Sequence, residues 1–97
     1  ERSSRVRWKI PAVRLAIYGT GRLALDLRST LDHLGCAVGA FVETSPRVRT
    51  VQGLPVLHVR QLRMDAVGFV AIGSVTYYPD MLDEIAKRGF RLGKNCA

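Results

Sequence analysis

The chain is poor in cysteine and has no long apolar segment, and both features limit the classes of protein to which it can belong. Its two cysteines, Cys36 and Cys96, lack the spacing of metal ligands and the density of a disulfide scaffold. No apolar run approaches the roughly 20 residues that cross a bilayer, and no signal-peptide pattern is present. We therefore expect a reduced, cytoplasmic setting, with Cys36 a small core residue at the start of a strand and Cys96 a loose thiol.

The chain also lacks the residue combinations that mark catalysis, metal binding or nucleic-acid recognition. Neither His33 nor His58 has a cysteine or aspartate placed to form a nucleophile system, so we predict surface roles for both. Acidic residues are few, and 8 Asp and Glu against 15 Lys and Arg give a net charge of +7. Because the basic residues are not interleaved with aromatics, we expect a solvated arginine-rich surface and no nucleic-acid partner. The alternative is attraction for a phosphorylated small molecule, or weak attraction for nucleic acid.

The composition divides the 97 residues into two parts. Residues 1–11 are polar and basic and end at Pro11, which indicates an arm or linker. The chain as a whole contains 47% hydrophobic residues, and residues 12–97 are long enough for one small domain with a single core. We expect this domain to be a fragment of a longer protein, with the remaining domains of that protein as partners.

Apolar runs alternate with helical patterns along the domain. We predict strands at 13–18, 37–42, 53–57 and 67–72, with a fifth starting at 90–92. A first helix over 21–34 carries one apolar stripe and ends at Gly35, and a second over 78–88 has Pro79 in its first turn and ends at Gly89. Pro55 places the third strand at a sheet edge or a bend. The stripe of the first helix is Leu23, Leu27, Leu31 and Leu34, and the inward face of the second is Leu82, Ile85 and Ala86.

The first strand runs into a glycine turn that opens a helix, and this is the most informative feature of the chain. Gly19 allows a tight turn, and Gly21 lets the backbone approach a pyrophosphate without a Cβ in the way. Ala24 stands at the third position of a G-x-G-x-x-G/A pattern, where a small residue lets helix and strand pack closely. Thr20 and Arg22 flank the turn and can supply a hydroxyl and a cation. The pattern predicts a phosphate-binding turn, with a plain strand-to-helix turn as the alternative.

Alternating strands and helices of these lengths imply right-handed βαβ crossovers and a parallel sheet. We predict a small three-layer, Rossmann-like α/β domain of four to five strands in the order 3-2-1-4, with the fifth strand beside the fourth. Ligands of such sheets bind outside the carboxyl ends of the strands. The Gly19–Gly21 turn, Glu43 and the Gly73–Ser74 turn are therefore expected around one crevice.

Glu43 lies 22 residues after Gly21, close to the ~20-residue offset at which an acidic side chain meets a ribose diol in dinucleotide folds. A solvent-facing glutamate at a strand end is the equally open alternative. Gly73 and Ser74 follow the fourth strand, where they can contact a base or sugar, although turn formation and helix capping are equally open for Ser74. Exposed loop charges are the expected role of Arg47 and Arg49, and a phosphate contact is the alternative. We predict no catalytic group and no metal ligand.

Short motifs along residues 13–92 resemble a family. They are IYGTGR at 17–22, VGAFVE at 38–43, GLPVL at 53–57, FVAIGS at 69–74, YYPDML at 77–82 and RGF at 88–90. This succession is similar to the Rossmann-like nucleotide-binding module, often labelled CoA-binding-like, of bacterial polysaccharide-biosynthesis enzymes. Such modules occur at the N-terminus of sugar acyltransferases and in nucleotide-sugar epimerases and dehydratases.

The resemblance implies an accessory domain that binds a nucleotide-sugar or NAD(P), with its phosphates at the Gly19–Gly21 turn. The expected cofactor-binding residues are Gly19, Thr20, Gly21, Arg22, Glu43, Gly73 and Ser74. Two alternatives stay open: a ligand-free module that holds partner chains, and a fragment of an NAD(P)-dependent epimerase or dehydratase. A homo-oligomer is compatible with each, and any chemistry is expected from a neighbouring domain.

Overall fold

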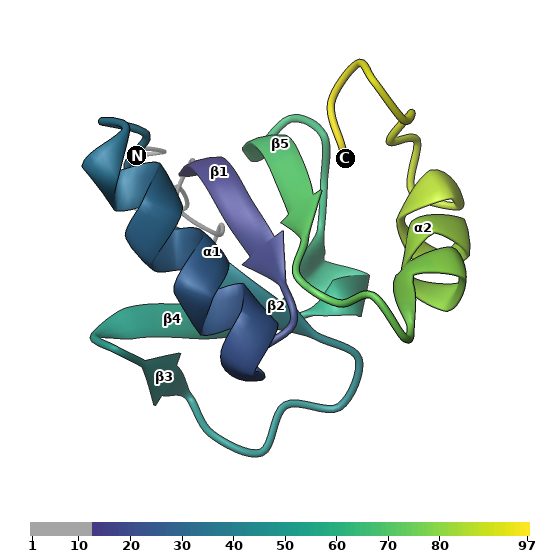
Figure 1. Ribbon diagram of the computed structural model, residues 1–97. Coiled ribbons are helices and arrows are strands. Elements are labelled where there is room, and N and C mark those ends of the chain that lie inside the picture. Colours follow the sequence, from purple (N-terminus) through teal and green to yellow (C-terminus); the bar gives the residue numbers. More distant parts are fainter. Residues whose placement is uncertain (1–12) are drawn as a thin grey trace, which may run out of the picture.

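The computed structural model describes residues 13–97, so the predicted basic arm lies outside the described residues. These residues form an α/β fold with two α-helices and a five-stranded sheet (Figure 1). The sheet order is β3-β4-β2-β1-β5, in which the first strand along the chain holds a central position. The strands are β1 (Val13–Tyr18), β2 (Ala40–Glu43), β3 (Thr50–Val51), β4 (Leu54–His58) and β5 (Val67–Ile72).

Four of these strands are parallel, and the sheet as a whole is mixed. β1 pairs with β2 and with β5, β2 pairs with β4, and all three pairings are parallel. β3 is antiparallel to β4 and opposes Thr50 to Pro55. The predicted order of the four long strands therefore agrees with the structure, and the expectation of a purely parallel sheet is wrong at this edge. Pro55 lies in β4, which has β2 on one side and β3 on the other, so the predicted position of this strand at a sheet edge is wrong, because Thr50–Val51 pairs with its first two residues.

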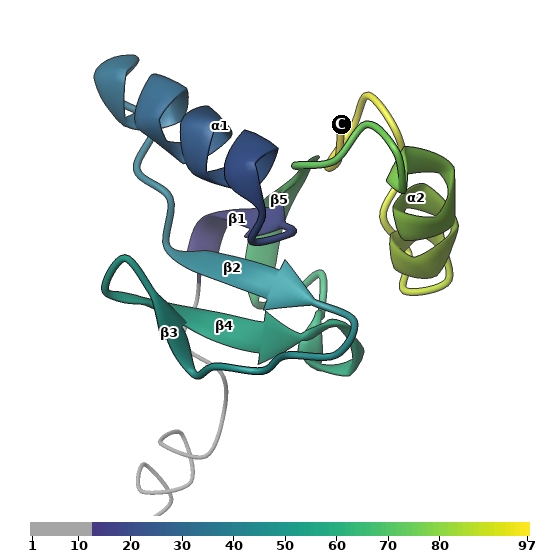
Figure 2. The ribbon, with the colours of Figure 1, turned by 60° about the horizontal axis from the view of Figure 1, so that its bottom comes forward.

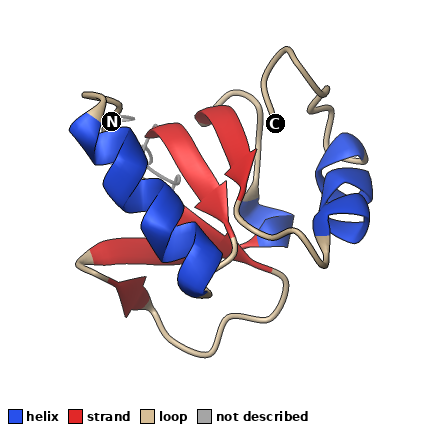
Figure 3. Ribbon diagram, in the orientation of Figure 1, coloured by secondary structure: helices blue, strands red, loops and turns tan. Residues whose placement is uncertain are grey.

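Two helices cover opposite faces of the sheet and give it three layers (Figure 2, Figure 3). On one face α1 (Arg22–His33) packs Ala24, Leu27 and Leu31 against Ile17 and Phe41. On the other, α2 (Tyr78–Ala86) packs against a cluster that includes Tyr18 and Val70. Because both faces of the sheet are covered, the central strands β1, β2 and β5 are largely apolar, as in other buried parallel sheets.

The helices end where the glycines predict, but their apolar faces differ in part from the prediction. Gly35 and Gly89 have φ angles of +79° and +96°, the left-handed conformation that ends a helix. Leu23 and Leu34 are exposed, because the stripe that meets the sheet runs through Ala24, Leu27 and Leu31 instead. In α2, Ala86 is exposed and Met81 packs against the core with Leu82 and Ile85.

The edge beyond β5 is filled by a different segment from the one predicted. Residues 90–92 form no strand; residues 95–97 lie parallel to β5 instead. The Val70 amide donates to the Asn95 carbonyl at 3.0 Å, and the Ile72 amide donates to the Ala97 carbonyl at 2.7 Å. This pairing buries Cys96 completely, while Cys36 is exposed, so both cysteine predictions are wrong.

No helix within residues 13–97 is long and apolar enough to cross a membrane.

Candidate functional site

The three segments predicted to converge do meet at the carboxyl ends of the strands. The Gly19 amide donates to the carbonyl of Val42 at 2.8 Å, which ties the turn after β1 to the end of β2. The Gly73 amide donates to the carbonyl of Tyr18 at 2.8 Å, which ties the same strand end to the turn after β5. The glycine turn, the end of β2 and the Gly73 turn therefore form one continuous edge.

Two of the glycines at this edge are required by the packing of the chain itself. Gly19 has a φ of +120°, and a Cβ there would lie 3.3 Å from the Gly73 carbonyl oxygen. A Cβ on Gly73 would lie 2.8 Å from the Cβ of Ala24 and 3.0 Å from the Cγ2 of Ile17. The first turn of α1 thus sits directly on the ends of β1 and β5, and Ala24 has the close-packing place that its pattern predicts.

Gly21 differs, because nothing in the described residues requires a glycine there. It is the N-cap residue of α1, its φ of −79° suits any residue, and a Cβ added to it would meet no atom within 4 Å. No side chain among residues 13–97 caps this helix end, and its first turn has no acidic residue. The first amides of the helix therefore have no capping side chain, and they carry the positive end of the helix dipole, an arrangement that suits an anion.

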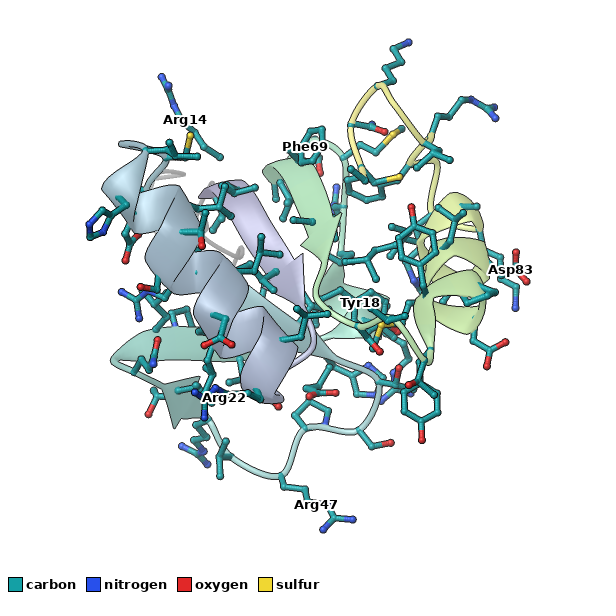
Figure 4. The ribbon with its side chains drawn as sticks, viewed as in Figure 1. Arg14, Tyr18, Arg22, Arg47, Phe69 and Asp83 are labelled. Carbon is teal, nitrogen blue, oxygen red and sulfur yellow. The ribbon has the colours of Figure 1, made fainter. Side chains whose placement is uncertain are left out.

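Thr20 and Glu43 are joined by a hydrogen bond in which the Thr20 hydroxyl donates to a carboxylate oxygen. Both line a hollow of about 270 Å³ beside the glycine turn, together with Arg47 from the loop after β2. In Figure 4 Arg47 projects from this loop. The remaining lining residues are Ser45, Val48 and Val56. A carboxylate and two hydroxyls thus line one hollow next to the helix end, and Arg47 extends outward at its rim.

A second hollow of about 350 Å³ lies on the other side of Glu43, toward α2. Tyr18 and Thr44 line it, and their hydroxyls are 2.6 Å apart. Burial raises the pKa of Tyr18, the charges of Glu84 and Glu43 add to this, and the hydrogen bond with Thr44 opposes it. Figure 4 shows Tyr18 between the end of β1 and α2. The other lining residues are Tyr77, Asp80, Met81 and Glu84.

Two predicted site residues, Arg22 and Ser74, have structural partners, as does His58, for which a surface role was predicted. Arg22 is strongly exposed and forms an ion pair with Asp26 one turn along α1, at 3.2 Å. The Ser74 hydroxyl accepts from the amide of Tyr77 at 3.1 Å, so it holds the turn that leads into α2. The His58 Nδ1 accepts from the Arg60 amide at 3.0 Å, and its role is to cap a one-turn 3₁₀ helix at Val59–Gln61.

Sequence reasoning missed several residues that the fold brings to this edge, among them Thr44, Ser45, Val48 and Asp80. In this order, the first three lie in the loop after β2, and Asp80 lies in the first turn of α2. The only sequence signal for these residues was their position after a predicted strand, since connections that leave the carboxyl ends of parallel strands gather at one edge. Within residues 13–97, no group of three or more His, Cys, Asp or Glu side chains can hold a metal ion.

No protein-family model, curated protein or solved structure matches this chain. The resemblance to nucleotide-binding modules of polysaccharide-biosynthesis enzymes therefore stays a prediction that depends on its short motifs.

Proposed function

We propose that the carboxyl-end site binds a nucleotide-sugar and that the domain is an accessory part of a larger protein of sugar or polysaccharide biosynthesis. The observation that carries the proposal is the uncapped start of α1 at Gly21, placed beside the bonded pair Thr20 and Glu43. An anion-binding helix end and a diol-binding carboxylate are the two parts that a nucleotide needs.

The phosphates would lie on the amides that follow Gly21. Glycine is required at Gly19 by backbone conformation, but at Gly21 only the approach of a ligand gives a reason to exclude a side chain. Arg47 lines the adjacent hollow and supplies a cation at its rim. Arg22, paired with Asp26, contributes less than the sequence predicted.

The ribose would meet Glu43. A carboxylate accepts several hydrogen bonds, so the donation from Thr20 leaves acceptor positions for the two hydroxyls of a diol. The Thr20 hydroxyl also fixes the orientation of the carboxylate before any ligand binds, which lowers the entropy that binding would cost.

The second hollow favours a sugar over a second phosphate. Its carboxylates, Glu43, Asp80 and Glu84, repel a phosphate but accept hydrogen bonds from sugar hydroxyls. Tyr77 is exposed at its rim and offers a ring on which a sugar can pack. This lining supports a nucleotide-sugar ahead of NADP.

The crevice also bears on the alternative of a module without a ligand. Such a module is expected to fill its crevice with side chains. Here both hollows are open, and the space over Gly21 is free of described atoms within 4 Å of a built Cβ. An interaction module remains the second candidate, because Val75 and Tyr77 expose apolar surface in the connection after β5.

Thermal unfolding with UDP-sugars, NAD(H), NADP(H), CoA and S-adenosylmethionine tests the proposal. A ligand at about ten times its dissociation constant adds about 1.4 kcal/mol of stability, or roughly 6–11 °C in Tm for a domain of this size. We expect this shift for a UDP-sugar and its loss in Gly21→Val. Ser29→Val is the matched control, since it places the same side chain on an exposed position of α1.

Glu43→Gln tests the contact with the ribose diol separately from the contact with the phosphates. It should weaken binding of a ribonucleotide-sugar about tenfold, as expected for one charge-assisted hydrogen bond, and leave the 2′-deoxy ligand almost unchanged. An equal shift in Gly21→Val and the parent protein contradicts the proposed site. No shift at millimolar ligand overturns the binding function and moves the interaction module to first place.

A further inference from the structure

A basic hollow lies away from the carboxyl-end site, between the segment that precedes β5 and the end of α2. It measures about 620 Å³, and four cations line it: Arg60, Arg63, Lys87 and Arg88. Figure 3 shows that the one-turn helix at the start of the first segment lies on the α2 side of the sheet. Packing of two distant segments therefore gathers the cations.

The floor of the basic hollow is apolar and held in place. Leu62 is buried in the core beneath it, and Met64 is half exposed at its surface. Met64 sits over Gly89, where an added Cβ would lie 2.7 Å from its Cε and 2.9 Å from its Sδ. The Asn95 amide also contacts the Met64 sulfur at 3.6 Å.

Positive charge exceeds negative charge around the basic hollow. Arg63 pairs with Asp65 at 2.8 Å, and Glu84 pairs with both Lys87 and Arg88 at 3.7 and 3.4 Å. Four cations therefore face two carboxylates, and the Nε of Arg88 is buried without a hydrogen-bond partner among the described residues.

Helix capping accounts for only half of these cations. Lys87 and Arg88 follow the last turn of α2, where a positive charge stabilises the helix dipole. Arg60 and Arg63 come from another segment and gain nothing from that dipole. Bringing them to the same hollow costs repulsion, which an anionic partner would relieve.

We propose that the basic hollow binds an acidic peptide segment of a partner chain or domain, with carboxylates on Arg60, Arg63 and Lys87 and an apolar side chain on Met64. Arginine pairs with carboxylates in a bidentate geometry, and methionine adapts to varied apolar partners. No aromatic residue lines the hollow, so it lacks the stacking surface that single-stranded nucleic acid needs. A small hydrated polyanion would leave Met64 unused.

Fluorescence anisotropy with a labelled short peptide of glutamates and two leucines tests the proposal. We expect saturable binding that weakens about fivefold or more when salt rises from about 50 to 300 mM, because exposed charges are screened. R60Q/R63Q should weaken binding about fivefold or more. The control R14Q/R49Q removes the same charge from exposed positions elsewhere and should change it less than about twofold.

Replacing the two leucines of the peptide by serine should also weaken binding, which identifies the contact with Met64. Should R60Q/R63Q unfold at a lower temperature than the parent protein, K87Q gives the same test from the exposed end of α2. Equal losses in R60Q/R63Q and the control overturn the proposal, as does a lack of saturable binding. Tighter binding of oligothymidine or tripolyphosphate than of the peptide overturns it too. Unchanged UDP-sugar binding in R60Q/R63Q separates this site from the carboxyl-end site.

Discussion

Gly73→Ala is the sharpest test of how closely α1 sits on the sheet. The added Cβ would lie 2.8 Å from the Cβ of Ala24, 2.9 Å from its Cα and 3.0 Å from the Cγ2 of Ile17. Both neighbours are fully buried, and none of these atoms is the end of a flexible side chain. The φ of Gly73 lies outside the left-handed region, so the cost is steric and not a matter of backbone conformation.

Overpacking of this kind typically destabilises a core by about 1–3 kcal/mol. For a domain of this size, 2 kcal/mol corresponds to a fall of roughly 8–16 °C in Tm. Ala24→Gly alone should cost about 1 kcal/mol through helix propensity. In the double variant Gly73→Ala/Ala24→Gly, the contact between the two Cβ atoms disappears. The loss in free energy of unfolding of the double variant should therefore be at least about 0.5 kcal/mol smaller than the sum of the losses of the two single variants.

Urea unfolding followed by far-ultraviolet circular dichroism measures all three variants. Gly21→Ala serves as control, because its Cβ meets open space and only the N-cap preference changes, by less than about 1 kcal/mol. Two results would refute the reasoning. A Gly73→Ala variant as stable as the parent would mean that α1 lies farther from β5, and strictly additive losses would mean that Ala24 is not the residue in contact.

Two further predictions concern Tyr18 and Arg28. Because burial raises the pKa of Tyr18 above its ordinary 10.0, its contribution to stability is present below pH 10.0 and is lost as the pH rises through the folded-state pKa. In urea unfolding, the free energy of unfolding should therefore fall more steeply above pH 10.0 in the parent protein than in Tyr18→Phe. Parallel pH dependences of the two proteins would contradict the argument. Arg28 of α1 donates to the carbonyl of Gln52 at 2.9 Å and pairs with Asp32 at 3.3 Å, so Arg28→Ala should lower the free energy of unfolding by about 1–2 kcal/mol, against less than about 0.5 for Arg14→Ala.

Local patterns were sufficient to predict the elements that bury an apolar face. β1 and β5 were predicted with the bounds that the structure has, because each is a largely apolar run of six residues followed by glycine. β3 has only two residues inside a charged loop, and its pairing with Pro55 depends on the turn at Gln52 and Gly53, so no local pattern marks it. The segment at 95–97 has only three residues, and it pairs along β5 because that strand offers it an edge, so no local pattern marks it.

The sequence predicted the location of the site better than the contacts within it. Glycine spacing and the position of Glu43 identified the edge at which the strand ends meet. The prediction for Arg22 did not include its ion pair with Asp26. This ion pair competes with any ligand for the same guanidinium. Cys36 and Cys96 were misjudged in opposite directions, since their burial depends on which segments pack over them and not on the residues beside them.

The central position of β1 also has a consequence for how the chain folds during synthesis. β1 pairs with β2 on one side and with β5 on the other, and β5 begins 49 residues after β1 ends. At about 5–20 residues per second, β1 then waits roughly 2–10 s with one edge unpaired. Its sequence is apolar apart from Arg14, whose exposed charge opposes pairing between nascent chains.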